Sequence, residues 1–299
     1  MARTSERPLA LPAGDDLRRG VVLALAAAAL FVTMDSCVKL LTARYPILQI
    51  VAINAFLAAV LTGAVAWWKK GPAALRSRRP GMQLLRGLGL LVIASLGFYA
   101  YAHLPLAEAY AILFSMPLVI TGLARPLLGE RVGWQRWTAV LVGFAGVLVI
   151  LWPGAQGFQL AALAALGNAI LASFTLIVMR VMREETPESF VVYGNATVAA
   201  GAALVLPFVW TTPTLPDLAL FLAAGIAASL ASLCIARAYQ SAPASIVAPF
   251  QYTQLLYALV IGVVLFGNVP DARTLAGAAM VIGCGLYIMR QGAAGGAQK

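Results

Sequence analysis

The sequence has few charged residues, one histidine and three cysteines, and these shortages exclude several classes of protein. Only 11% of its 299 residues are Asp, Glu, Lys or Arg, whereas soluble proteins contain about a quarter. A soluble fold of this composition would lack the polar side chains to cover its surface, so we expect lipid to be its solvent. Cys37, Cys234 and Cys284 each lie singly in an apolar run, which indicates neither a metal site nor a disulfide framework.

The residues that catalysis needs are also scarce. A membrane enzyme requires a cluster of acids, bases, nucleophiles or metal ligands, and one histidine, three scattered cysteines and 11 acidic residues do not supply one. The sequence contains no phosphate-binding loop for ATP. We therefore expect no enzymatic activity, no cofactor and no bound metal ion.

Apolar residues dominate the chain and are grouped in long runs. They make up 62% of the residues, and the mean hydropathy is +0.88. A transmembrane helix needs about 20 mostly apolar residues, and ten such runs are separated by proline and glycine signals. The runs lie at 20–42, 46–68, 82–102, 106–128, 134–152, 157–182, 188–210, 217–239, 244–267 and 272–290. The sequence thus predicts an all-α integral membrane protein of ten transmembrane helices.

The basic residues orient this arrangement. With the N-terminus inside, all but three of the 21 Lys and Arg residues fall at the cytoplasmic ends, the exceptions being Lys39, Arg44 and Arg273. Cytoplasmic loops accumulate Lys and Arg, so we expect both termini in the cytoplasm and the chain in the cytoplasmic (inner) membrane. The same rule explains the net charge of +10 without a nucleic-acid partner.

The chain repeats itself at two fixed spacings. A spacing of 141 residues relates Lys39 to Arg180, Pro46 to Pro187 and Asn54 to Asn195, and one of 137 relates Ala107 to Ala244 and Gly146 to Gly283. We therefore expect a cytoplasmic tail at 1–19, a first five-helix repeat at 20–152, a second at 153–290 and a C-terminal tail at 291–299. Because five is odd, the second repeat must be inverted. Inverted repeats build a substrate site near the bilayer midplane.

Several stretches resemble a known family. They are Ala107–Pro117 (AEAYAILFSMP), Leu128–Val132 (LGERV), Gly143–Ile150 (GFAGVLVI), Ala236–Ala244 (ARAYQSAPA) and Phe266–Pro270 (FGNVP). Over about residues 18–290 the chain resembles the drug/metabolite transporter superfamily, EamA type, and within it the bacterial amino-acid exporters of the YddG kind. The resemblance implies alternating access through a cavity inside helices one to four and six to nine. The second repeat departs from the pattern, with Gly267-Asn268 where the first has Glu130-Arg131.

The preferred function is therefore a secondary exporter of small metabolites, with amino acids as the favoured class. The alternative is a carrier of cationic compounds, which needs an unpaired membrane carboxylate that Asp35 alone could provide. A membrane-embedded enzyme is the least favoured reading, and a phosphate or nucleotide-sugar exchanger is disfavoured because the last two helices lack a midplane Lys or Arg. Partners are expected to be the substrate and the bilayer, and no oligomeric state is indicated.

Polar residues inside the apolar runs are the candidates for the substrate pathway: Asn54, Tyr99, Tyr101, Asn195, Gln251, Tyr252 and Gln254. Each has a structural alternative. Buried asparagines also join helices by hydrogen bonds, tyrosines also anchor helix ends at the membrane interface, and a glutamine stripe also packs inside a bundle.

Asp35 and Lys39 are the remaining candidates, and they lie one helical turn apart. An ionisable residue inside a membrane is costly and indicates a functional site. The pair is expected either to couple transport to an ion or to form a structural ion pair, with Lys39 reaching toward the outer interface.

Overall fold

The computed structural model describes residues 14–128, 134–151, 160–182, 185–241, 247 and 249–296. The expected tails, the Glu130-Arg131 motif and Ala244 lie outside these ranges wholly or in part. The described residues are helical and contain no strand. The helices are α1 (Gly14–Leu41), α2 (Ile47–Lys70), the 3₁₀ turn η1 (Pro72–Leu75), α3 (Pro80–His103), α4 (Leu106–Leu113), α5 (Met116–Leu128), α6 (Trp134–Leu151), α7 (Leu160–Val181), α8 (Pro187–Ala203), α9 (Leu206–Val209), α10 (Leu215–Ser241), α12 (Thr253–Phe266) and α13 (Ala272–Gly296).

Four of these helices are long and apolar enough to cross a bilayer by themselves: Leu17–Leu41, Ile47–Lys70, Pro80–His103 and Leu215–Tyr239. Shorter apolar helices lie in five of the other six expected spans, and α8 and α9 lie in the remaining one, at 188–210. Every expected span therefore coincides with helix, while the count of ten crossings stays a prediction.

Two expected spans are broken by proline. The span at 106–128 is divided into α4 and α5 by a turn at Phe114 and Ser115, and the span at 188–210 into α8 and α9 by a turn at Leu204 and Val205. Pro117 and Pro207 each lie four residues after the last residue of the preceding helix, Leu113 and Ala203. A proline lacks the amide hydrogen of the helical ladder, and its ring clashes with the carbonyl four residues earlier, so each helix ends before its proline.

The helices pack with small residues in the interior of the bundle and large apolar residues on its outer surface. Fully buried positions include many alanines, among them Ala100 and Ala165, whereas Leu141 and Val264 are exposed on the outside. Small residues allow helix backbones to approach closely in membranes. An outer surface of large apolar side chains suits lipid rather than water, in agreement with the composition.

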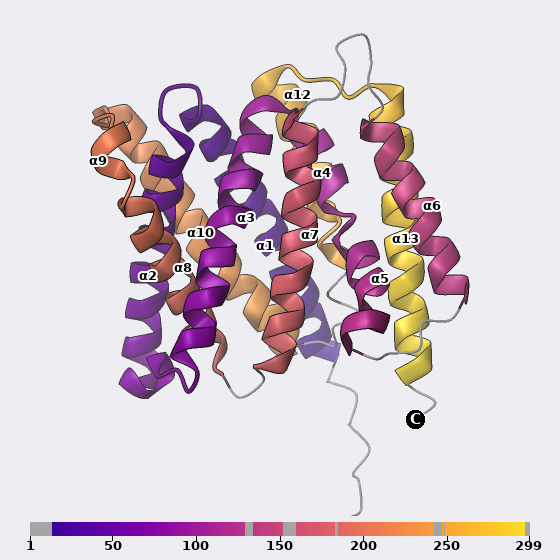
Figure 1. Cartoon of the computed structure of the whole chain (residues 1–299), viewed down its shortest axis with the longest axis horizontal. Helices are drawn as coiled ribbons and strands as arrows, with labels where there is room; N and C mark the ends of the chain where they lie inside the picture. Colours follow the sequence, from indigo (N-terminus) through magenta and orange to yellow (C-terminus); the bar gives the residue numbers. More distant parts are fainter. Residues whose placement is uncertain are drawn as a thin grey trace, which may run out of the picture.

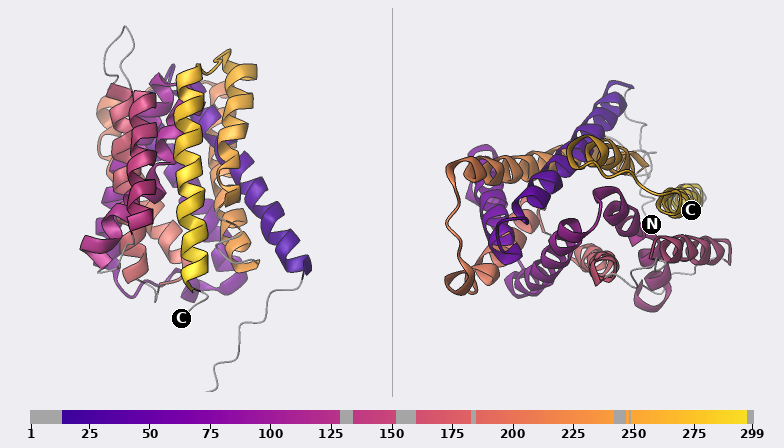
Figure 2. Two further views of the ribbon diagram at one scale, coloured as in Figure 1. Left: turned by 90° about the vertical axis from the view of Figure 1, so that its right-hand side faces the viewer. Right: turned by 90° about the horizontal axis from the view of Figure 1, so that it is seen from above.

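The start of α1 and the end of α13 lie at the same end of the bundle, which is the lower end in Figure 1. We call this the terminal end and the opposite one the far end. Helices α6 and α13 contact each other along one side of the bundle (Figures 1 and 2), remote from α2 and α8. A Cβ atom on Gly146 would lie 2.9 Å from the carbonyl oxygen of Gly277, so these two glycines permit the close α6–α13 contact. Gly283, which the repeat relates to Gly146, has open space beside it.

The contacts between helices follow one pattern in the two halves. In chain order, α1, α2 and α3 correspond to α7, α8 and α10, and the α4–α5 pair corresponds to α12. Helix α1 packs on α10 as α3 packs on α7, and α2 packs on α10 as α3 packs on α8. Helices α2 and α8 contact each other, as do α4 and α12. Exchanging the halves therefore reproduces these contacts.

Candidate functional site

A cavity of about 450 Å³ lies between α1, α3, α4, α5 and α7, and the end of α10 and the segment at 251–254 complete its wall. Of the residues expected along the pathway, Tyr101, Gln251, Tyr252 and Gln254 line it, and so does Asp35. A groove of about 740 Å³ between α2, α8 and α10 is lined only by apolar side chains such as Phe56 and Leu222. It offers no polar side chain to orient a substrate, so the first cavity is the better candidate site.

Helix breaks border the cavity from both halves of the chain. The first is the turn at Phe114-Ser115, and the second is the turn at Gln251-Tyr252 that precedes α12. The two turns are related by the 137-residue spacing found in the sequence. Discontinuous helices at equivalent positions in two repeats are typical of transporter substrate sites, because they bring backbone polar groups to the midplane.

Five aromatic rings form a continuous wall of the cavity. The centroids of Phe98 and Tyr101 lie 6.4 Å apart, those of Tyr101 and Tyr110 6.0 Å, and those of Tyr110 and Phe114 5.9 Å. Phe114 in turn lies 4.9 Å from Tyr252. Such distances are typical of interacting aromatic pairs. The wall therefore offers a preformed apolar surface of the kind that a ring-bearing ligand can pack against.

Asp35 is the carboxyl group of this site. The residue is 3% exposed, and its Oδ2 accepts a hydrogen bond from the Tyr110 hydroxyl. Among the described residues its buried Oδ1 has no hydrogen-bond partner, and Tyr101 also interacts with the carboxyl. A buried carboxyl oxygen without a donor is costly, which marks this position as unusual within the bundle.

Lys39 does not pair with Asp35, contrary to the ion-pair expectation. Its Nζ donates hydrogen bonds to the carbonyl oxygens of Tyr101 at 2.7 Å and Leu104 at 2.5 Å, and it lies 5.5 Å from the Phe266 ring centroid. These carbonyls end α3, where a helix carries partial negative charge. Asp35 and Lys39 share a helix face, which led to the expectation of a pair. At the far end of the bundle, however, the carbonyl oxygens at the end of α3 accept hydrogen bonds from Lys39 instead.

Amide side chains supply the other polar groups of the cavity. Gln251 donates a hydrogen bond of 2.6 Å to the Tyr239 hydroxyl, and Gln254 lies beside it on the first turn of α12. Asn168, on α7, also lines the cavity and donates to the carbonyl oxygen of Ile93 at 2.7 Å. The glutamine stripe thus starts in the turn before α12, where the sequence led us to expect an uninterrupted helix.

Three of the expected pathway residues lie away from the cavity. Asn54 is buried on α2 with its Oδ1 unpartnered, and Asn195 donates to the carbonyl of Val191 on its own helix at 2.9 Å. The ring of Tyr99 stacks 4.3 Å from His103 near the end of α3. None of the three is among the residues that line the cavity.

Sequence reasoning missed several residues of the site. Tyr110 was not among the candidates for the pathway, yet it is 3% exposed and donates a hydrogen bond to Asp35. Phe98, Phe114 and Asn168 were not singled out. Pro117 inside an apolar run was the available signal for the break at Phe114, because proline interrupts helices.

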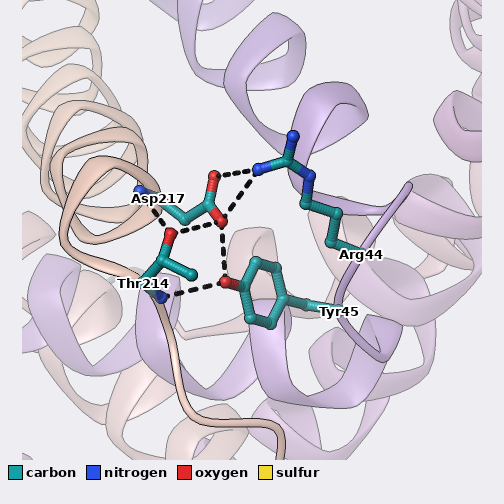
Figure 3. A network of polar contacts seen from close by, with 4 residues as sticks. All are labelled: Arg44, Tyr45, Thr214 and Asp217. Carbon is teal, nitrogen blue, oxygen red and sulfur yellow. Dashed lines mark hydrogen bonds and ion pairs between the residues drawn. The ribbon is translucent and has the colours of Figure 1, made fainter.

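A polar network closes the far end of the bundle (Figure 3). Asp217, near the start of α10, accepts hydrogen bonds from Thr214 at 2.7 Å, Tyr45 at 2.8 Å and Arg44 at 3.1 Å. The α1–α2 connection is thereby attached to the beginning of α10.

A comparable network lies at the terminal end. Glu185, between α7 and α8, accepts hydrogen bonds from the Ser77 hydroxyl and from the backbone amides of Arg78 and Arg79 at 2.8–2.9 Å. Ser189 donates to its other oxygen at 3.1 Å. Arg44 and Glu185 are 141 residues apart, and Ser77 and Thr214 are 137 apart, so the repeat spacings relate the two networks.

A helical bundle of two matching halves around a cavity is the architecture of many membrane transporters. The model of the EamA-like transporter family matches the chain twice, over residues 18–152 and 159–290, and the chain belongs to this family within the drug/metabolite transporter superfamily. The resemblance to the EamA-type drug/metabolite transporters is confirmed.

Similar proteins include a riboflavin transporter of Rhizobium johnstonii, 35% identical over 74% of this chain and 74% of its own length. An S-adenosylmethionine uptake transporter of Rickettsia bellii is 31% identical over 73% of this chain and 76% of its own length. A pseudopaline exporter of Pseudomonas aeruginosa is 28% identical over 90% of this chain and 95% of its own length. A crystal structure with a TM-score of 0.64 and 21% identity covers 90% of this chain and 95% of its own, which supports the fold alone.

Proposed function

We propose that this transporter is a secondary carrier that moves a small metabolite across the cytoplasmic membrane by alternating access through the cavity. In this proposal the chain crosses the bilayer ten times as two inverted halves, with both termini in the cytoplasm. The matched contacts of the two halves and the distribution of Lys and Arg support it. The observation that carries the proposal is the contact between two equivalent helix breaks, at Phe114 and Tyr252. Both residues line a mostly apolar cavity that contains a few polar side chains.

For the substrate we propose an amino acid with a large apolar or aromatic side chain, exported from the cell. The ring wall from Phe98 to Tyr252 suits such a side chain, while Asp35, Asn168 and Gln254 can bind the polar end of the molecule. A few oriented polar groups among mostly apolar walls are the usual composition of a small-molecule site. Riboflavin and S-adenosylmethionine, which two relatives are named for, also combine a heteroaromatic ring with a polar chain.

A carrier of organic cations is the second candidate, and one observation favours it. Asp35 has no ion-pair partner in the part of the chain that the structure describes, because Lys39 is bonded to α3. The objection that the sequence raised against this candidate is thereby removed. An enzymatic role has less support, since the family and the relatives are transporters by name.

Counterflow into proteoliposomes tests the proposal. Purified protein is reconstituted with unlabelled compound inside, and uptake of labelled phenylalanine, riboflavin, S-adenosylmethionine or a cationic dye is followed. Transient accumulation of phenylalanine, absent from protein-free liposomes, is the expected result. Accumulation of the dye alone would favour the cation carrier, and no accumulation of any compound would contradict the proposed function for this panel.

A further inference from the structure

Asp35 lines the cavity beside aromatic rings, and among the described residues its buried Oδ1 has no hydrogen-bond partner. We infer that Asp35, Tyr101 and Tyr110 form a subsite for a primary ammonium group of the substrate. The inference deepens the proposed function and rests on it, because it names the chemistry that the cavity recognises.

The carboxylate of Asp35 needs a compensating positive charge. An ionised carboxylate that is buried without a cation or sufficient donors is strongly unfavourable. Lys39 is the nearest basic residue on α1, and its ammonium is occupied by the carbonyls of Tyr101 and Leu104. From α3 and α4 the titratable side chains at the carboxyl are the phenols of Tyr101 and Tyr110, which are neutral. The compensating positive charge must therefore arrive with a ligand or a proton.

The surrounding rings are arranged to favour a cation. Tyr101 and Tyr110 stack at 6.0 Å, and Phe114 follows at 5.9 Å. Aromatic faces attract ammonium groups electrostatically, and more strongly where water is excluded. The hydroxyl of Tyr110 is bonded to Oδ2, so it holds the carboxyl in place and leaves Oδ1 as the acceptor for the ligand.

The burial of Oδ1 determines the size of the cation. Oδ1 is buried behind the cavity wall, so a ligand reaches it only when the wall around it opens, and a compact donor needs the smallest opening. A primary ammonium has three N–H donors and fits this requirement. A trimethylammonium group has no donor and is too bulky, so the subsite should discriminate between the two even though both are attracted by aromatic rings.

The aromatic wall and the amides account for the remainder of the ligand. The apolar part can lie along the rings of Phe114 and Tyr252, which are 4.9 Å apart. Gln254 and Asn168 line the same cavity and can bind an additional polar group. The inferred substrate class is therefore a primary amine with an aromatic or large apolar part, including amino acids with such side chains.

Isothermal titration of the purified full chain tests the subsite with three matched probes. They are 2-phenylethylammonium, its N,N,N-trimethyl derivative and the neutral 2-phenylethanol. We expect the primary ammonium to bind the wild type about tenfold or more tightly than the other two, because charge-assisted hydrogen bonds are the stronger ones. This comparison needs no substitution, so it does not depend on the folding of a variant.

Variants then locate the effect. Asp35→Asn should weaken binding of the primary ammonium about tenfold or more and leave 2-phenylethanol unchanged. Glu108→Gln is the matched control, because Glu108 is a carboxyl on α4 that is not among the residues lining the cavity. It should leave all three affinities unchanged. Size-exclusion profiles and thermal unfolding check that the variants are folded.

Three results would overturn the inference: equal binding of the three probes to the wild type, equal binding of the ammonium to wild type and Asp35→Asn, or loss of 2-phenylethanol binding in a folded Asp35→Asn protein. Counterflow separates this failure from that of the proposed function. Exchange that is unaffected by Asp35→Asn contradicts the subsite and leaves the carrier function standing. Asp35-dependent binding without exchange of any tested compound supports the subsite and contradicts the carrier function.

Discussion

The rings of Phe114 and Tyr252 lie 4.9 Å apart and join two helix breaks that belong to different halves of the chain. Each ring lies in or beside a turn whose backbone is not part of a continuous helix. The contact therefore connects the two helix breaks in the cavity wall. A change at either turn is expected to be felt at the other, as alternating access between two repeats requires.

Gln254 is expected to contribute to substrate affinity, and Asn195 is not. Gln254 lines the cavity, whereas Asn195 bonds to the backbone of its own helix. Gln254→Leu, alone or with Gln251→Leu, should lower affinity about three- to tenfold, since a hydrogen bond contributes about 0.5–1.5 kcal/mol. Asn195→Leu should have little effect. Counterflow against substrate concentration measures both, and a larger effect of Asn195→Leu would contradict the location of the site.

Gly285→Ala is expected to displace Tyr252. A Cβ atom at this position on α13 would overlap the Tyr252 hydroxyl, and overpacking a bundle costs about 1–3 kcal/mol. We expect lower thermal stability and weaker substrate binding. Because the Tyr252 hydroxyl has no hydrogen-bond partner, adding Tyr252→Phe should relieve most of the overlap. Failure of the double variant to recover either property would show that the defect arises elsewhere.

Asp217 is expected to matter more than Arg44 for the stability of the far-end network. The side chain of Arg44 is 69% exposed and that of Asp217 is 6% exposed. Arg44→Ala therefore removes a largely solvated ion pair, worth about 0–1 kcal/mol. Asp217→Ala also leaves Tyr45 and Thr214 without their acceptor. Thermal unfolding should show the larger decrease in melting temperature for Asp217→Ala, and equal decreases would contradict this ranking.

The terminal-end network is expected to weaken in acid. Burial raises the pKa of Glu185, but hydrogen bonds from Ser77, Arg79, Ser189 and Arg78 outweigh burial and hold the pKa below its ordinary value. A lowered folded pKa gives a stability contribution that is complete above the unfolded pKa, about 4.3, and is lost as the pH falls through the folded pKa.

Melting temperatures at neutral and acidic pH measure this effect. The wild type should lose more stability on acidification than Glu185→Gln, which carries no titratable group at this position. A Glu188→Gln protein serves as a second carboxyl variant near the start of α8. If wild type and Glu185→Gln lose stability in parallel, the Glu185 carboxylate does not contribute to the pH dependence.

Both termini are expected in the cytoplasm. Single cysteines introduced at Ala2 and Gln298 should react with an impermeant maleimide only after intact cells are permeabilised. The three native cysteines are first replaced, and a cysteine at Arg273, on the other side in this topology, should react without permeabilisation. Labelling of either terminus in intact cells would reverse the orientation that the Lys and Arg distribution predicts.

The sequence by itself determined the all-helical membrane architecture, where most of the helices lie, and the family. These properties can be read without knowing which residues touch. Hydropathy is averaged over about 20 neighbouring positions, and repeat spacings are counted along the chain. The sequence also identified four residues that line the cavity, because polar groups inside an apolar run must avoid lipid. They are Tyr101, Gln251, Tyr252 and Gln254.

Only the tertiary structure decided which side chains meet. Asp35 and Lys39 share a helix face, so sequence spacing predicts a pair, but the end of α3 lies within reach of Lys39 and its carbonyls compete successfully. Tyr110, 75 residues from Asp35 in the chain, became the partner of the carboxyl instead. Asn54 and Asn195 occupy equivalent positions and still lie away from the cavity. The partner of a side chain depends on how helices pack, and packing is set by the whole interior at once.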